Sequence, residues 1–388
     1  MNSSLTSAQL EIREGVDKVC ARFGDDYWLE RDTDGEFPHA FHKALADAGW
    51  LGIAMPEAYG GSGLGITEAA IMMQTIAQSG AAFSGASAVH MNIFGLNPVV
   101  VFGTEEQKRR FLPPLIAGKE KSCFAVTEPD AGLDTTRLKT RAVKHGNGYA
   151  IHGQKIWIST AQVADRVLLL ARTTPLEEVG KRTEGLSLFY TALDRKYVEA
   201  RVIDKMGRKA VDSNQLFFDG MPVPLEDRIG EEGKGFEYIL HGMNPERILI
   251  AAEAVGVGRA ALARATRYAK ERIVFGRPIG QNQGIQHPLA RCWMELEAAN
   301  LMVLKAAHLY DAGEPCGIES NAAKYLGAEA GFNACEASVL AHGGMGYAKE
   351  FHVERLMREV MIARIAPVSR ELILCNIAER ALGLPKSY

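Results

Sequence analysis

The hydrophobic positions recur with two different periods along the chain. In the first 120 residues they follow helical spacing, as in ITEAAIMMQTIAQSG, a predicted helix that should end at Gly80. A first helix over residues 5–23 should be capped by Thr6 or Ser7. From about Ser122 the apolar residues form short β-rich runs between turn residues, including a hairpin with a GNG turn. Helical spacing returns after the loop GEEGKGF, in four long stretches.

This alternation predicts an α+β protein made of three successive domains. We expect an N-terminal all-helical domain over residues 1–120 and a middle antiparallel β domain over residues 121–232. A C-terminal four-helix bundle should occupy residues 233–388. The chain has 388 residues, of which 47% are hydrophobic, so it can bury a large core in several subdomains.

Charge and composition exclude several classes of partner. Forty-four basic residues against forty-seven acidic ones give a formal charge of -3, without the basic block that a nucleic-acid-binding surface needs. No apolar run approaches the ~20 residues that span a bilayer, and the opening segment lacks a secretory leader pattern, so we expect a cytoplasmic protein. The six cysteines are scattered, which favours free thiols in a reducing compartment.

Two further patterns carry no site. Gly256, Gly258 and Ala261 fit the dinucleotide pattern GxGxxA, but they lie within a helical run that no strand precedes, so a packing face is the better interpretation. His39 and His42 stand three apart on a helix without a cysteine or carboxylate at ligand spacing. No metal site is predicted.

A charged pair, Glu246 and Arg247, begins the otherwise apolar run NPERILIAAEAVG. One interpretation is structural, because Asn244 could be an N-cap with Pro245 in the first turn. The helix dipole would then favour an acidic side chain there by about 0.3 to 1 kcal/mol. The other interpretation is a carboxylate base in an active site. The local sequence leaves both open.

Several segments together resemble the acyl-CoA dehydrogenase family, an FAD-dependent group of oxidoreductases. The two that resemble its flavin-binding core are CFAVTEPDAGLDTT (123–136) and KIWISTA (155–161). The resemblance covers nearly the whole chain and continues through ADAGWLGIAMPEAYGGSGLG, FGTEEQKRRFLPPLIAG, KMG, ERIVFGRPI and HGGMGY. It implies the helical, β, helical order of domains that the hydrophobic pattern predicts.

The resemblance implies FAD as the cofactor. A flavin that accepts a hydride at N5 needs hydrogen-bond donors along one edge and a flat apolar side chain against the ring. By resemblance, Phe124, Val126 and Thr127 line that edge, Trp157 packs near the ring, Ser159 offers its hydroxyl toward N5, and Ser369 also contacts the cofactor. Taken singly, each of these would more often be structural.

A second set of residues matches family positions that reach the adenosine half of FAD from another subunit. These residues are Arg272, Phe275, Gln283, Gly343 and Gly344. The resemblance therefore implies a homotetramer arranged as a dimer of dimers. Without the family match, Arg272 would as readily be a solvated surface charge.

The position of the base distinguishes branches of the family. Many members carry a glutamate in a late Y-E-G-T segment, which matches residues 366–369 here, and Pro367 replaces that glutamate. Proline also lacks the backbone N–H that polarises the thioester carbonyl in relatives. In isovaleryl-CoA and long-chain acyl-CoA dehydrogenases the base directly precedes an arginine on an earlier helix. Glu246, followed by Arg247, matches that position.

We therefore expect an acyl-CoA dehydrogenase of fatty acid metabolism that converts an acyl-CoA thioester to the trans-2-enoyl-CoA. Glu246 would remove the α-proton, and Leu133, Asn244 and Arg247 would contact the substrate. Electrons would pass to electron-transfer flavoprotein. The alternatives are an acyl-CoA oxidase or enoyl-CoA reductase on the same scaffold, and a non-catalytic acyl-CoA-binding flavoprotein or partner subunit. The preferred chain length is left open.

Overall fold

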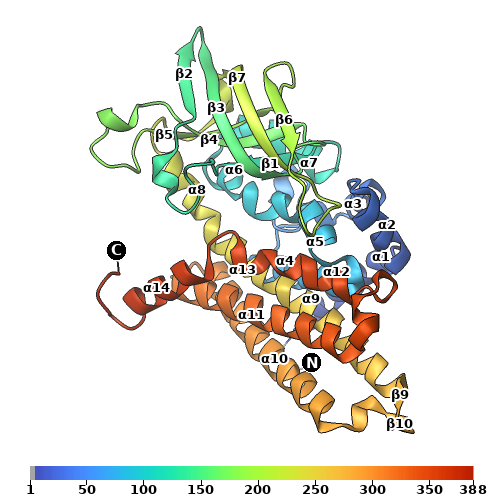
Figure 1. Ribbon diagram of the computed structural model, residues 1–388. Coiled ribbons are helices and arrows are strands. Elements are labelled where there is room, and N and C mark those ends of the chain that lie inside the picture. Colours follow the sequence, from blue (N-terminus) through green and yellow to red (C-terminus); the bar gives the residue numbers. More distant parts are fainter. Residues whose placement is uncertain (1–4, 388) are drawn as a thin grey trace.

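The computed structural model describes residues 5–387, so the outermost positions of the predicted first and last domains lie outside the described residues. The chain forms a helical block, a β block and a second helical block (Figure 1). The first block contains α1 (Ser7–Cys20), α2 (Asp25–Asp34), α3 (His39–Asp47), α4 (Ile66–Ile76), α5 (Ala82–His90), α6 (Asn97–Phe102) and α7 (Glu105–Ile116). Thr6 caps α1, because its hydroxyl accepts a hydrogen bond from the backbone of Gln9 at 3.2 Å.

The helix expected to end at Gly80 is α4, and it ends earlier, at Ile76. A π-helical turn over Ala77–Ala81 follows, in which Gly80 has a φ of 103°, and the chain then continues directly into α5. By length and composition the stretch Ile66–Phe102 could cross a membrane, but 67% of its most apolar window is buried inside the protein. These apolar residues form part of the main hydrophobic core.

The β block is one sheet in the order β6-β7-β3-β2-β4-β5-β8, and β1 pairs with β4. Its strands are β1 (Ser122–Ala125), β2 (Arg141–His145), β3 (Gly148–Ser159), β4 (Arg166–Arg172), β5 (Leu186–Ala192), β6 (Val198–Val202), β7 (Ser213–Pro224) and β8 (Arg228–Ile229). Antiparallel pairs predominate, as predicted, but β1 and β2 each pair with β4 in parallel. The predicted hairpin is β2–β3.

The C-terminal block is built around three long helices. It contains α8 (Gly235–His241), α9 (Met243–Glu271), a small hairpin of β9 (Ile273–Val274) and β10 (Arg277–Pro278), α10 (Gln283–Asp311), α11 (Gly317–His342), α12 (Val353–Val360), α13 (Ile362–Ile365) and α14 (Arg370–Arg380). The predicted fourth helix is divided, because a turn at Met361 separates α12 from α13.

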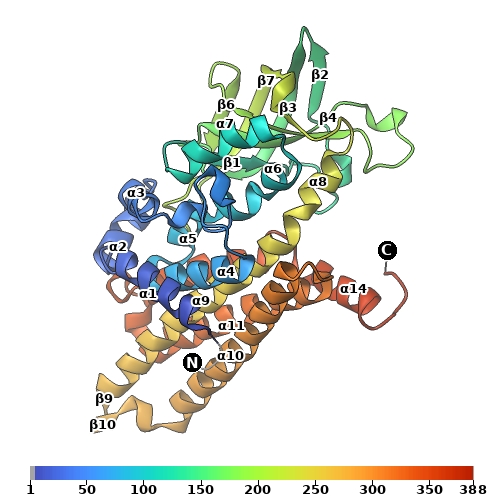
Figure 2. The ribbon, with the colours of Figure 1, turned by 180° about the vertical axis from the view of Figure 1, so that it is seen from behind.

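Helix α9 connects the β block to the far end of the molecule. Its first turn lies beside the sheet, and its last turn leads into the β9–β10 hairpin at the opposite end (Figures 1 and 2). A Cβ on Gly256 would lie 2.4 Å from the carbonyl oxygen of Gln74, so α9 crosses α4 at backbone contact. A Cβ on Gly258 would lie 3.0 Å from the Cα of Gly331 on α11. The glycine pattern is therefore a packing face, as expected.

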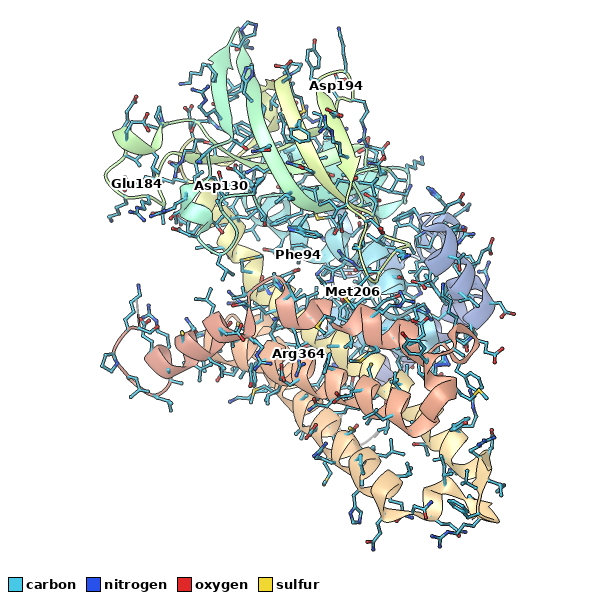
Figure 3. All side chains as sticks on the ribbon, in the orientation of Figure 1. Phe94, Asp130, Glu184, Asp194, Met206 and Arg364 are labelled. Atoms are coloured by element: carbon cyan, nitrogen blue, oxygen red, sulfur yellow. The ribbon has the colours of Figure 1, made fainter. Side chains whose placement is uncertain are left out.

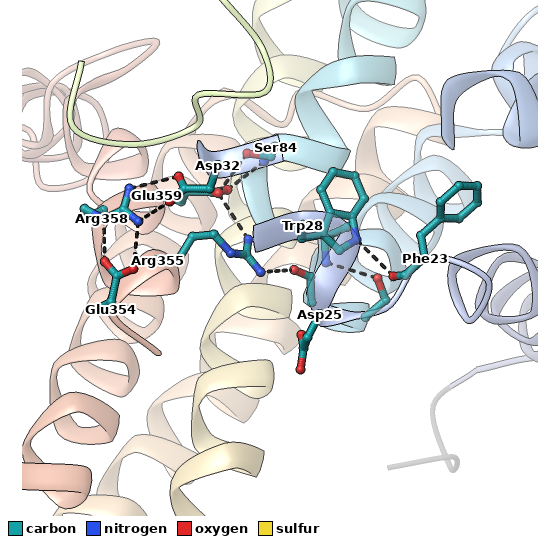
Figure 4. A network of polar contacts seen from close by, with 12 residues as sticks. Phe23, Asp25, Trp28, Asp32, Ser84, Glu354, Arg355, Arg358 and Glu359 are labelled. Carbon is teal, nitrogen blue, oxygen red and sulfur yellow. Dashed lines mark hydrogen bonds and ion pairs between the residues drawn. The ribbon is translucent and has the colours of Figure 1, made fainter. Parts of the chain in front are cut away.

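A buried polar network ties the start of α5 to α12 (Figure 4). The carboxylate of Glu359 accepts hydrogen bonds from the backbone N–H of Ser84 at 2.7 Å and from its hydroxyl at 2.8 Å. Arg355 donates to the carbonyl of Gly80 at 2.7 Å, and Arg358 pairs with Asp32 at 2.6 Å. Because Ser84, Arg355 and Glu359 are buried and bonded, the network fixes α5 against the C-terminal helices.

Candidate active site

The two motif segments that resemble a flavin-binding core lie against each other. The backbone N–H of Ile156 donates to the carbonyl of Thr127 at 2.9 Å. The ammonium group of Lys155 is fully buried and donates to the carbonyl of Val126 at 2.8 Å. The same group pairs with the carboxylate of Glu128 at 2.9 Å. Segments that are almost thirty residues apart in the sequence therefore form one unit.

Trp157 projects from the sheet at an irregularity in β3. The pairing of β3 with β7 shifts register between Lys155 and Ile158, and Trp157 has a φ of 62°. Its side chain is 56% exposed, which gives an uncovered aromatic plane. The hydroxyl of Ser159, two residues on, accepts a hydrogen bond from Arg208 at 3.0 Å, so its own O–H remains available to donate. An exposed ring beside a hydroxyl donor fits a flavin.

Glu246 lies in the first turn of α9 and is only 7% exposed. The expectation that Asn244 caps this helix is wrong. The helix begins at Met243 with Gly242 as its N-cap, and the N–H of Glu246 already bonds the carbonyl of Gly242 at 3.0 Å. The amide oxygen of Asn244 instead accepts from Arg247 at 3.2 Å. Asn244 and Arg247, which were both predicted to contact the substrate, are therefore hydrogen-bonded to each other.

The carboxylate of Glu246 is bonded to His90, the last residue of α5, rather than to Arg247. His90 Nε2 lies 2.5 Å from Glu246 Oε2, and His90 Nδ1 bonds Oε1 of Glu253, two turns further along α9. His90 and Glu253 are buried, Glu253 completely. Neither His90 nor Glu253 was predicted from the sequence. The available signal was the presence of single ionisable residues in otherwise apolar runs, AFSGASAVHMNIFG and ILIAAEAVG.

The two carboxylates determine the charge of His90. Burial alone would lower the pKa of His90, but Glu253 and Glu246 together raise it to about 10, so the ring is an imidazolium at neutral pH. Burial also raises the pKa of Glu253, although the charge of His90 opposes this. Burial lowers the pKa of the nearby Arg208, and Glu253 opposes that change as well. The cluster therefore places a cationic ring between two carboxyl groups.

An aromatic pair connects this cluster to the flavin-type motif. The ring of His90 lies 4.7 Å from the ring of Phe94, centroid to centroid, and Phe94 lies 5.2 Å from Phe124. Figure 3 shows Phe94 in the layer between the sheet and the C-terminal helices. Phe124 is half-buried on β1. The rings of His90 and Phe94 therefore lie between Glu246 and Phe124, in the layer where the β domain meets the helices.

The predicted cross-subunit residues lie elsewhere. All five are exposed, and they stand at the far end of α9, at the start of α10 and at the end of α11: Arg272, Phe275, Gln283, Gly343 and Gly344. A helix of this length places Arg272 about 39 Å from Glu246 along α9. One chain therefore does not bring Arg272 to Glu246. Leu133 is exposed in the loop after β1, and Ser369 caps α14 through Leu372.

The segment that carries a glutamate in many relatives has a different polar partner here. Lys324 is buried and donates to the carbonyl of Val368 at 2.7 Å, one residue after Pro367. Burial lowers the pKa of Lys324 to about 8, and the neighbouring Arg247 acts in the same direction. Of the buried carboxylates within residues 5–387, Glu246 and Glu253 are the two that bond His90.

A β motif with an exposed aromatic side chain, and a buried carboxylate at the start of α9, fit a flavin-dependent oxidoreductase. The chain belongs to the acyl-CoA dehydrogenase family. Three family models match: the N-terminal domain over residues 6–119, the middle domain over residues 123–221 and the C-terminal domain over residues 233–382. The protein is accordingly a flavoprotein that acts on acyl-CoA.

Named relatives match over most of their length. Acyl-CoA dehydrogenase FadE12 of Mycobacterium tuberculosis is 38% identical over 97% of this chain and 96% of its own. The CarC subunit of the caffeyl-CoA reductase–Etf complex of Acetobacterium woodii is 35% identical over 87% of this chain and 88% of its own. The structure of butyryl-CoA dehydrogenase from Megasphaera elsdenii superposes with a TM-score of 0.89, at 30% identity, over 98% of this chain and all of that one.

Proposed function

We propose that the protein dehydrogenates an acyl-CoA thioester with bound FAD, using Glu246 as the base that removes the α-proton. The position of Glu246 carries the proposal. It is a buried carboxylate at the first turn of α9, in the layer that also contains the β1 and β3 motifs. Removal of the α-proton breaks the Cα–H bond and forms an O–H bond on Glu246. Bound FAD would supply the acceptor for the β-hydride.

The remaining residues of the site bind and orient. Trp157 supplies an apolar plane, and Ser159 supplies a hydroxyl whose proton is free because its oxygen accepts from Arg208. Phe124 on β1, with Val126 and Thr127 directly after the strand, provides the edge along which the ring would lie, and Lys155 holds that edge to β3. Arg247, fixed to Asn244, offers a cation beside Glu246 for the thioester substrate.

We further propose that electrons leave through electron-transfer flavoprotein. The relative CarC is named as a subunit of a complex with Etf, and it covers most of this chain at 35% identity. The redox partner determines the direction of the net reaction, because dehydrogenation and enoyl reduction use the same base and the same hydride-transfer geometry. Both directions therefore have to be measured.

Anaerobic titration of the flavin-loaded protein with a panel of straight-chain and branched acyl-CoA thioesters tests this function. At least one saturated thioester should bleach the visible flavin band, and the product should be the trans-2-enoyl-CoA by mass spectrometry. A panel that leaves the band unchanged would reject the proposal. Rapid reoxidation by the enoyl-CoA without acyl-CoA-driven bleaching would assign a reductase, and peroxide release in air would assign an oxidase.

We also propose that the protein is a homotetramer and that the five exposed residues near the β9–β10 hairpin complete the FAD site of a neighbouring subunit. Large apolar side chains are exposed in this region: Phe275 is fully exposed, Tyr347 is 90% exposed and Leu340 is 72% exposed. On α10, Met294 and Leu301 are 59% and 63% exposed and lie seven residues apart, hence on one face. Exposed apolar faces of this kind are typical of subunit contacts.

Two glutamates placed on that face of α10 should dissociate the oligomer. In the double variant Met294→Glu, Leu301→Glu, two carboxylates per subunit would have to be desolvated at the contact. Analytical ultracentrifugation should show a smaller species, and flavin should be lost on gel filtration. Val202→Glu, at a side chain 62% exposed on β6, is the matched control and should remain a tetramer with full flavin. A double variant that stays tetrameric would contradict the proposed interface.

A further inference from the structure

The cluster of His90, Glu246 and Glu253 is more elaborate than a lone base requires. Glu246 and Glu253 stand seven residues apart on α9, so both project from one face toward the end of α5. His90 lies between them and uses both ring nitrogens, Nε2 on Glu246 and Nδ1 on Glu253. The inference drawn from this cluster rests on the function proposed above, since it concerns how Glu246 is held.

Stability alone does not account for the cluster. Three ionisable groups are buried together, and Oε2 of Glu253 has no hydrogen-bond partner among the described residues. Burying charges costs more than packing apolar side chains of similar volume, even when the charges are paired. The fully buried Glu253 faces no substrate-binding motif, and its bond to His90 is the one hydrogen bond of its side chain within residues 5–387. The hydrogen bond between Glu253 and His90 indicates that Glu253 acts through His90.

Other charged groups face the cluster from three elements. Arg208, in the loop between β6 and β7, donates to Ser87 on α5 at 3.1 Å and to Ser159 on β3 at 3.0 Å. Its positive charge acts on Glu253 and, more weakly, on Glu246. Arg247 lies beside Glu246 on α9, and Lys324 faces it from α11. The imidazolium of His90 is the cation that makes a hydrogen bond to Glu246 itself.

We propose that His90, anchored by Glu253, is a positioning residue that holds Oε2 of Glu246 and directs Oε1 toward the α-carbon of acyl-CoA. Within the described chain, the bond from His90 is the only hydrogen bond to the Glu246 carboxylate, so Oε1 stays free to take a proton. The α-proton moves to Oε1, and the Cα–H electron pair remains on carbon to form the double bond as the β-hydride leaves. His90 keeps both its protons, and its Nδ1 stays bonded to Glu253.

Two substitutions separate the hydrogen bond from the charge. His90→Gln places an amide donor near the position of Nε2 but carries no charge, and His90→Ala removes both. The loss of alignment in His90→Ala should slow flavin reduction and α-deuterium uptake from D2O by about 100-fold, with the dissociation constant for acyl-CoA changed by less than about threefold. His90→Gln should recover most of this loss at high pH. His42→Gln, at a buried histidine on α3, is the matched control and should match the wild type.

The pH profile distinguishes positioning from a merely structural role. Loss of the cation beside the base should move the acidic limb of the reduction rate to higher pH in His90→Gln, whereas a packing defect would lower the rate without moving the limb. A second readout does not depend on activity. The pKa of His90 is raised from 6.5 to about 10 on folding, so its stabilising effect is complete below pH 6.5 and is lost as pH rises toward 10.

The difference in unfolding free energy between wild type and His90→Gln should therefore shrink over that window in denaturant titrations. Wild-type rates, an unmoved acidic limb and a constant stability difference in His90→Gln would overturn the proposal. If His90→Ala does not fold, His90→Gln still decides. A wild-type protein that no acyl-CoA reduces would instead reject the proposed function. If acyl-CoA reduces the wild type and the His90 variants but not Glu246→Gln, the proposed role of His90 is rejected and the proposed function stands.

Discussion

Glu246→Gln is expected to slow reduction of the bound flavin by acyl-CoA by about 1,000-fold, within the range that a positioned general base contributes. The amide preserves the volume of the side chain and can still accept from His90 Nε2, which lies 2.5 Å from Oε2 in the wild type. Binding of acyl-CoA should therefore persist. Stopped-flow absorbance under anaerobic conditions measures the rate, and the spectral shift on adding acyl-CoA measures binding.

Glu237→Gln is the matched control for this variant. Glu237 is an exposed glutamate on α8, nine residues before Glu246, and its neutralisation should leave the rate within about twofold of the wild type. The neighbouring Glu253 provides the alternative outcome. If Glu246→Gln is reduced at the wild-type rate while Glu253→Gln is not, the base is Glu253 and the assignment of Glu246 is wrong.

Lys155→Met is expected to destabilise the protein by about 3 to 5 kcal/mol, because it leaves Glu128 as a buried carboxylate without its cation. Lys155 is fully buried and joins β3 to the segment after β1 through Val126 and Glu128. The carboxylate keeps two backbone donors, Lys139 and Thr140, which limits the loss. Because this bond holds the two flavin motifs together, flavin should also dissociate more readily. Denaturant unfolding and flavin release on dilution are the measurements.

Burial would raise the pKa of Glu128, but Lys155 and the backbone donors lower it below its ordinary value of 4.5. The pair therefore stabilises the fold between pH 4.5 and about 8, the value to which burial lowers the pKa of Lys155, and this contribution is lost as pH falls through the lowered pKa of Glu128. The wild type and Lys155→Met should accordingly converge in acid. Lys144→Met, on the adjacent strand, is the control. Its ion pair with Glu232 is 3.4 Å long and its side chain is 76% exposed, so it should behave as the wild type.

The local elements of the site follow from the sequence because short-range rules determine them. The GNG turn sets the β2–β3 hairpin, and short β-rich runs between turn residues predict the strands that carry Phe124 and Trp157. Gly256 identifies a helix crossing because no side chain fits there. The exposed direction of Trp157, by contrast, depends on a shift in β3 pairing that only the partner strand reveals.

The polar core of the site could not be derived in the same way. His90 and Glu246 are 156 residues apart, and their contact depends on how α5 packs on α9. Helix α5 itself is buried on nearly all sides, so its sequence lacks the amphipathic period that marks a surface helix. The cap expected at Asn244 failed for a similar reason, since α8 leads through Gly242 directly into α9. Long-range packing overrode local preference in each case.

The crystal structure of Glu246→Gln with FAD and a reducing acyl-CoA bound tests the central claim most directly, because the variant should bind the substrate without consuming it. We predict that the Cα–Cβ bond of the thioester lies between the residue 246 side chain and flavin N5, with the substituted amide at position 246 within about 3.5 Å of Cα and His90 still bonded to it. A substrate whose Cα faces another carboxylate, with residue 246 turned away from the ring, would contradict the account.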